Sequence, residues 1–264
     1  MHREKNLFVR VVEFANLYRA FVGASRSKRD QPAVRAFEYD LEPRLWEIRR
    51  ELEAGTYQWG AYRRFRITDP KPREIRAGPF RDRVVHHALF NVLDPPLRRG
   101  FIADTYACIR GRGTHAAVQR YRGFVRARAG HGYRVQCDIK SYFATVDHHV
   151  LLGLLSRRIG DERLLRLVET LIDHGAELPG RGMPIGNLTS QLFANVYLDP
   201  LDHFVKEVLR VRHYIRYMDD FLLLFGLAQR ANAVRLSRAL FAARDVCNIG
   251  KRLLVRTIAD LAHP

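Results

Sequence analysis

Apolar residues recur every three or four positions along several parts of the chain, which is the spacing of an amphipathic helix. This pattern predicts one helix within residues 6–22 and a second from Phe37 to Leu52, which Gly55 would end. The basic stretch 25–30 between them is interpreted as a solvated loop. Two further helices are predicted from Phe80 to Pro95-Pro96 and from Ala116, with Thr114 as N-cap, to about Arg128. Another is predicted from His148, capped by Asp147, to about Ile159. The last two are predicted from the glycine-containing loop at 179–187 past Pro200 to Val208, and over residues 227–246.

Alternation of apolar and polar residues predicts the strands. A short strand begins near Tyr62 and leads into a basic hairpin. From Gly132 to Ile139 the apolar residues share one face, and Asp138 lies with the polar residues on the other. Two apolar, aromatic-rich runs within residues 214–225 flank a pair of acids and predict a tight hairpin.

The composition indicates how large the core can be and which charge a binding partner would carry. The chain has 264 residues, 47% of them apolar, which is enough for one large domain or two interlocked subdomains. Its 45 Lys and Arg residues exceed its 28 Asp and Glu residues and give a net charge of +17. A surplus of this size in so short a chain favours a polyanionic partner, with nucleic acid as the first expectation.

The sequence also bears on the cellular setting. It contains no run of about 18 apolar residues and no visible secretory signal, so a membrane partner is not expected. Cys108, Cys137 and Cys247 are scattered, so neither a zinc cluster nor a disulfide framework is predicted. A reducing, cytoplasmic setting is therefore expected.

Three acids carry the candidate chemistry. Asp219 and Asp220 lie at the tip of the predicted hairpin, and Asp138 lies near the end of another strand. Most acids at turns are only solvated, because aspartate favours turns. Two neighbouring strands, however, could present Asp138 and Asp219 to one pair of Mg²⁺ ions, which prefer carboxylate and phosphate oxygens. Two ions about 3.5–4 Å apart can stabilise both the attacking and the leaving oxygen of a phosphoryl transfer.

Cations follow the short strand near Tyr62. Lys71, Arg73 and Arg76 would suit a triphosphate or a template phosphate if the hairpin presents them to one partner. The alternative is a basic hairpin that faces solvent. The His86-His87 pair is not expected to bind a metal, since adjacent helical residues point in different directions.

These motifs, in this order, resemble a reverse transcriptase of the bacterial, group II intron-like kind, from about Leu7 to Phe225. Residues 138–143 (Asp-Ile-Lys-Ser-Tyr-Phe) look like motif A of that family, and residues 217–220 (Tyr-Met-Asp-Asp) look like its metal-binding motif C. The three cations resemble its fingers motif, which contacts the incoming triphosphate and the template.

The resemblance implies a fold and a metal site. The implied fold class is α+β, a right-hand polymerase with N-terminal helices and fingers in residues 1–130 and an antiparallel palm sheet with packed helices in residues 131–264, together one reverse transcriptase domain. Phe143 would be the aromatic gate that rejects a ribose 2′-hydroxyl. Two Mg²⁺ ions, or Mn²⁺, would be held by three catalytic acids and one strand neighbour: Asp138, Asp219, Asp220 and Ile139.

The loop from Ile185 to Gln191 separates subfamilies. Many relatives have Gln-Gly-x-x-x-Ser-Pro, whereas this chain has Ile-Gly-Asn-Leu-Thr-Ser-Gln and resembles the reverse transcriptases of diversity-generating retroelements. In that family, the aliphatic residue is tied to error-prone copying of template adenines, because losing a polar contact loosens discrimination. Ile185, Gly186 and Gln191 are therefore predicted to contact the nucleotide or the template.

The function implied is that of an RNA-directed DNA polymerase of a diversity-generating retroelement, with template RNA, primer, cDNA, dNTPs and a small basic accessory protein as partners. A bacterial or phage-encoded cytoplasmic protein is expected. Residues 247–264 do not match the palm lysine, primer grip and thumb of relatives, so the thumb is expected to be absent or truncated. The alternatives are a retron-like or phage-defence reverse transcriptase and a truncated, non-catalytic nucleic-acid-binding remnant.

Overall fold

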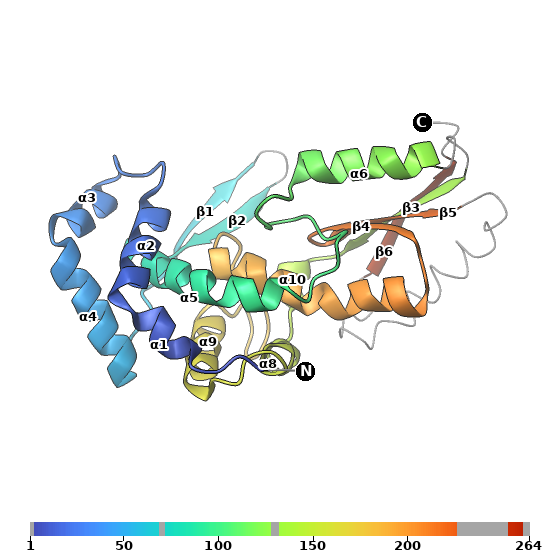
Figure 1. Ribbon diagram of the computed structural model, residues 1–264. Helices are drawn as coiled ribbons and strands as arrows, with labels where there is room; N and C mark the ends of the chain where they lie inside the picture. The colour runs from blue at the N-terminus through green and yellow to red at the C-terminus, as the bar shows by residue number, and fades with distance from the viewer. Residues whose placement is uncertain (1–2, 69–71, 128–131, 226–252, 261–264) are drawn as a thin grey trace. The chain divides into compact units, whose positions relative to one another are not determined.

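The chain folds into two compact units that alternate along the sequence. The helical unit consists of Met1–Arg99 and Val146–Phe193, and the sheet unit consists of Gly100–Thr145 and Ala194–Pro264. The predicted boundary at residues 130 and 131 concerned fingers and palm, and it stays a prediction. The computed structural model describes residues 3–68, 72–127, 132–225 and 253–260 (Figure 1).

The helical unit is built on α5, against which α1 and α2 pack. Three rings from three helices, Phe21, Phe37 and Phe80, lie with their centroids 5.2–6.1 Å apart and form part of its core. The elements of this unit are α1 (Leu7–Val12), α2 (Phe14–Ser25), α3 (Pro32–Tyr39), α4 (Leu41–Ala54), α5 (Phe80–Arg98), α8 (His148–Ser156), α9 (Glu162–His174) and the antiparallel hairpin of β1 (Arg63–Ile67) and β2 (Arg73–Ala77).

Both long N-terminal helices that the periodicity predicts are broken in two. Glu13 separates α1 from α2 with non-helical torsions of φ −54° and ψ 130°. The buried Asn16 side chain donates to the Val11 carbonyl at 3.0 Å, so the end of α1 keeps a hydrogen-bond partner. The apolar periodicity continues across the break because α1 and α2 each bury an apolar face. Gly55 ends α4 as predicted, with a left-handed φ of 71°.

Helix α5 does not end at Pro95-Pro96, which corrects the prediction. Both prolines lie inside it, and it continues to Arg98. A proline removes one backbone hydrogen bond, but its fixed φ is compatible with a helix. Leu93 and Leu97 on either side are fully buried, and their packing sustains the helix through the two prolines.

The sheet unit contains a four-stranded antiparallel sheet with the order β4-β5-β3-β6. Val135, Cys137 and Ile139 on β3 are at most 1% exposed, which confirms the predicted apolar face. Strand β6 was not predicted, while the helix predicted at 227–246 lies outside the described residues. The strands are β3 (Tyr133–Ile139), β4 (His213–Tyr217), β5 (Asp220–Phe225) and β6 (Leu253–Asp260).

Helix α6 (Thr114–Ala127) packs on one face of this sheet, as Figure 1 shows, through a cluster that includes Phe124, Ile215 and Leu224. Thr114 is the first residue of this helix rather than its N-cap, and its hydroxyl hydrogen-bonds to that of Tyr217 at 3.1 Å. Helix α10 (Leu188–His203) contains Pro200 and is followed by a π-helical turn, η1 (Phe204–Val208). The predicted continuation past Pro200 is therefore confirmed.

Candidate active site

The turn between β4 and β5 carries the acidic pair. Tyr217 pairs with Asp220, so Met218 and Asp219 form a two-residue turn. Met218 has a φ of 60°, a left-handed conformation that costs a residue with a side chain roughly 1–3 kcal/mol. Asp219 is half-buried and Asp220 is exposed. The predicted hairpin is confirmed, and its tip holds backbone strain that the surrounding structure must maintain.

Strand pairing brings the third acid to the same edge of the sheet. Strands β3 and β5 are antiparallel, and Cys137 lies opposite Phe221. The next step in this register places Asp138 across from Asp220. Asp138 is 7% exposed, and its backbone pairs with Leu254 on β6. The backbone positions of the three predicted catalytic acids therefore lie at one edge of the sheet, within the sheet unit alone.

This edge suits a hard divalent ion. Mg²⁺ takes oxygen ligands and commonly uses only one or two carboxylates, with water and substrate phosphates completing its shell. In the described part of the chain, no three His, Cys, Asp or Glu side chains are grouped closely enough to form a ready-made metal site. Asp138, Asp219 and Asp220 would hold the ion. Ile139 has a buried apolar side chain, so only its backbone carbonyl oxygen is available as a ligand.

The segment after β3 turns sharply and places two aromatic rings. Ser141 has a φ of 53° and leads into the short helix α7 (Tyr142–Thr145). Tyr142 is buried and donates from its hydroxyl to the Ala194 carbonyl at 2.6 Å. Phe143 is half-buried and lies edge-on to Tyr142, with ring centroids 5.4 Å apart. Tyr142 is thus an anchor, and Phe143 is the ring of the pair that can meet a substrate.

In the helical unit, the loop that begins at Ile185 docks on β2. The Arg76 backbone N–H donates to the Ile185 carbonyl at 3.1 Å. Gly186 has a φ of 121°, and a Cβ there would lie 3.1 Å from Ile75 Cγ2 and 3.3 Å from the Arg76 carbonyl oxygen. Glycine is therefore required by both torsion and space. Asn187 extends the contact by donating to the Tyr62 hydroxyl at 2.8 Å.

Of the predicted fingers cations, Arg76 is the one whose side-chain contacts the structure describes. Arg73 and Arg76 both lie on β2. The Arg76 guanidinium lies 3.4 Å from Glu177 and 3.4 Å from Glu74. Lys71 lies outside the described residues. That one partner meets all three cations, and the binding role of each, stays a prediction.

A different set of cations lines a cavity of about 810 Å³ in the helical unit. Lys28, Arg63 and Arg83 contribute to its wall, and none of the described residues that line it is an acid. Arg83 Nε is buried without a hydrogen-bond partner in the described structure, and burial, followed by the charge of Arg63, lowers the pKa of Arg83. An anion would relieve both effects. The stretch with Lys28 was predicted to be a solvated loop, and no local pattern shows otherwise, because Arg63 and Arg83 lie far from Lys28 in the chain.

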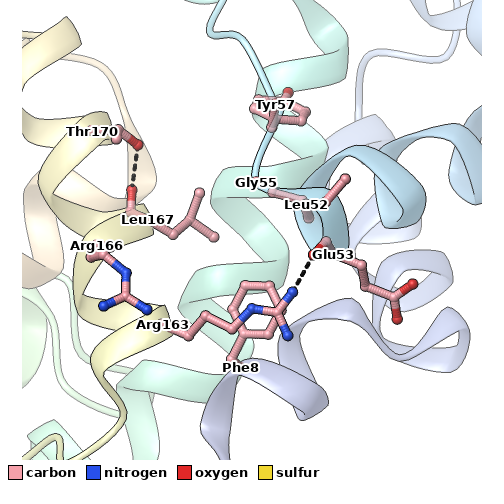
Figure 2. A pocket seen from close by; sticks show the side chains of 10 residues that line it. Phe8, Leu52, Glu53, Gly55, Tyr57, Arg163, Arg166, Leu167 and Thr170 are labelled. Carbon is pink, nitrogen blue, oxygen red and sulfur yellow. Dashed lines mark hydrogen bonds between the residues drawn. The ribbon is translucent and has the colours of Figure 1, made fainter.

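A smaller cavity, of about 370 Å³, lies between α4 and α9 (Figure 2). Arg163 crosses it, with its guanidinium 4.2 Å from the centre of the Phe8 ring, and donates to the Glu53 carbonyl. That carbonyl belongs to the last turn of α4, where cations are favourable. Arg163 therefore links the start of α9 to the end of α4, and its guanidinium already has partners in Phe8 and Glu53.

His86 ties α5 to the start of α10, because its Nδ1 lies 2.7 Å from the Thr189 hydroxyl. Burial, with smaller contributions from His87 and His174, lowers the pKa of His86 to about 3. The unfolded chain binds this proton near pH 6.5, so the free energy of unfolding must fall as the pH falls from 6.5 towards 3. We expect His86 to account for a loss of about 2 kcal/mol at pH 5.

Urea unfolding at pH 7 and pH 5 measures this loss. His86→Gln should flatten the pH dependence relative to wild type, whereas His149→Gln, at an exposed position of α8, should leave it unchanged. Equal slopes for wild type and His86→Gln would contradict the assignment.

Comparison with known proteins gives the class of protein and its family. Residues 68–244 match the family described as reverse transcriptase (RNA-dependent DNA polymerase). This match covers most of the chain, so the chain belongs to the reverse transcriptase family, whose members are nucleotidyltransferases.

Curated relatives are similar to part of the chain. Protein YkfC of Escherichia coli is 29% identical over 181 residues, which are 63% of this chain and 46% of YkfC. The group II intron-encoded protein LtrA of Lactococcus lactis subsp. cremoris is 27% identical over 176 residues, which are 63% of this chain and 29% of LtrA. The chain thus spans less than half the length of these relatives.

Solved structures share the fold. A chain of a partial Cas6-RT-Cas1–Cas2 complex matches with a TM-score of 0.51 at 22% identity, covering 89% of this chain and 42% of that one. A chain in the structure of telomerase from Candida albicans matches with a TM-score of 0.55 at 11% identity, covering 82% and 47%. The predicted α+β polymerase fold is confirmed, while the prediction about the thumb concerns residues that are largely outside the described ranges. Among the described residues, no helix is both long and apolar enough to cross a membrane.

Proposed function

We propose that the chain is the RNA-directed DNA polymerase of a diversity-generating retroelement, and that it copies template RNA into cDNA. The observation that carries the subfamily is the Ile185–Gln191 loop, with an aliphatic residue where many relatives have glutamine and with Gly186 packed on β2. The observation that carries the chemistry is the meeting of Asp138, Asp219 and Asp220 at one sheet edge.

The reaction proposed is attack of a primer 3′-hydroxyl on the α-phosphate of a dNTP. Bound Mg²⁺ ions, or Mn²⁺, would supply charge neutralisation at the attacking oxygen and at the leaving pyrophosphate. Asp138 and Asp219 hold the ions, and Asp220 completes the negative edge. Phe143 is half-buried and follows Asp138 by five residues in the chain. Its ring excludes nucleotides that carry a ribose 2′-hydroxyl.

Template RNA is the proposed polyanion. The net charge of +17 supports this proposal, and so does the cavity to whose wall Lys28, Arg63 and Arg83 contribute. Guanidinium groups pair with phosphate oxygens through two parallel hydrogen bonds. Primer, cDNA and dNTPs are further partners, and the small basic accessory protein rests on the subfamily resemblance.

Fidelity at template adenines tests the subfamily. The Ile185 backbone is fixed by Arg76, and its side chain is half-buried. We expect Ile185→Gln to lower misincorporation opposite template adenine by roughly 10-fold, because a polar contact is restored, while errors opposite other bases change little. Sequencing of cDNA made on an RNA template with all four bases measures both rates.

Leu178→Gln is the matched control, because Leu178 is an aliphatic residue of the same unit that is 63% exposed. It should leave the error spectrum unchanged. Wild-type cDNA without an excess of errors at adenines would reject the subfamily and keep the polymerase. Salt-sensitive RNA binding without any extension would instead favour the non-catalytic remnant.

A further inference from the structure

Arg216 is a fully buried cation three residues before Asp219. It lies on β4 with its side chain on the same face as Tyr214, which is also fully buried. The intervening Ile215 belongs to the opposite face, where it packs in the cluster beside α6. A charge at 0% exposure in a strand requires a specific set of partners, and the sheet unit supplies them.

Asp202 on α10 pairs with this guanidinium side-on, through Nε and Nη2. Arg216 Nε donates to Oδ1 and Nη2 donates to Oδ2, both at 2.7 Å. The carboxylate also accepts from the Tyr214 hydroxyl at 2.6 Å and from the Thr105 hydroxyl at 2.8 Å. Asn195 Oδ1 accepts from Arg216 Nη1 at 3.0 Å, and the Asn195 carbonyl accepts from Nη2 at 3.4 Å.

The remaining donor of Arg216 reaches the catalytic turn. Nη1 also donates to the Met218 carbonyl oxygen at 3.1 Å, so every N–H of the guanidinium has an acceptor. Met218 is the residue of this turn with a left-handed φ, 60°. Its carbonyl belongs to the planar peptide unit that continues into Asp219. Fixing that oxygen therefore fixes the direction in which the Asp219 backbone leaves the turn.

Stability alone does not account for this arrangement. Removing two charges from water costs several kcal/mol per ion, and a well-packed apolar pair of similar volume is often as stable as a buried ion pair. The pair instead joins α10 to one defined oxygen of the strained turn. Its specific contribution is therefore positional.

We infer that Arg216, held by Asp202, is a positioning residue that orients the Met218–Asp219 peptide so that the Asp219 carboxylate is aimed at the divalent ion. The inference rests on the proposed metal-dependent function of this edge, and it adds a residue that touches neither the ion nor the substrate. Partners that orient a metal ligand from behind typically contribute 10- to 100-fold to metal affinity.

The test replaces the pair with apolar residues, as Arg216→Met with Asp202→Leu, so that no unpaired charge remains buried. Mn²⁺ binding to the full chain is measured by electron paramagnetic resonance with MnCl₂ alone. We expect Kd for Mn²⁺ to rise about 10-fold or more. The Mg²⁺ concentration for half-maximal primer extension should rise in parallel, while KM for dNTP changes little.

Tyr214→Phe is the matched control, because it removes a hydrogen bond from the same buried network without touching Met218. It should leave Kd for Mn²⁺ unchanged. A folded double variant with wild-type Mn²⁺ affinity overturns the inference, as does a wild-type chain that binds no Mn²⁺. If circular dichroism shows that the double variant is unfolded, Kd for Mn²⁺ is measured on Arg216→Lys instead. The same rise is expected, since one amine cannot reach both Asp202 oxygens and the Met218 carbonyl, and an unchanged Kd overturns the inference. If the wild-type chain binds Mn²⁺ but does not extend a primer, the proposed function is rejected. The comparison of Mn²⁺ affinities between wild type and the double variant still tests the role of Arg216.

Discussion

Replacing Asp219 with asparagine is expected to reduce primer extension on an RNA template by a factor of about 10³. The substitution keeps the size of the side chain and removes the negative charge that would hold a divalent ion at the tip of the β4–β5 turn. The rate is measured with a saturating primer–template and excess dNTP in Mg²⁺ buffer. RNA affinity should stay close to wild type, because the basic surfaces are untouched.

Glu207→Gln provides the control for this prediction. Glu207 lies on η1 in the same unit, its side chain is 68% exposed, and the change removes the same charge away from the acidic edge. It should leave the rate within about twofold of wild type, as expected for an exposed ion pair. Asp219→Asn with wild-type activity would remove Asp219 from the catalytic set.

Replacing Phe143 with alanine is expected to raise the use of ribonucleotides relative to deoxynucleotides by roughly 10- to 100-fold. The half-buried ring follows Asp138 by five residues and is steadied by edge-on contact with Tyr142. Removing it opens the space that a 2′-hydroxyl would occupy. The ratio of kcat/KM values for dCTP and CTP opposite template guanine gives the measurement.

Tyr142→Phe is the control that distinguishes sugar selection by the Phe143 ring from a general effect on the stability of α7. It deletes the hydroxyl that donates to the Ala194 carbonyl and should lower stability without changing sugar selection. If both variants shift the ratio equally, selection comes from the placement of α7 as a whole, and Phe143 is not the gate.

Local sequence patterns were sufficient wherever an element is defined by its own residues. The alternation on β3, the hairpin around Asp219 and the Asp147 cap, whose carboxylate accepts from the Val150 N–H at 3.1 Å, all follow from short-range chemistry. The break at Glu13 did not follow, because apolar periodicity continues across it. Pro95 was misjudged for the complementary reason, since tertiary packing overrides a local helix breaker.

The candidate residues could be read from the chain alone: the acids near strand ends, the aromatic ring of Phe143 and the glycine loop. Tertiary structure decided which of them meet. The register of β3 against β5 places Asp138 beside Asp220. It also buried Arg216 on Asp202, a pairing with no local signal, because the partners come from a strand and a helix that meet only when the sheet unit folds. Periodicity reports the face of an element, whereas strand register and ion pairing depend on segments far apart in the chain.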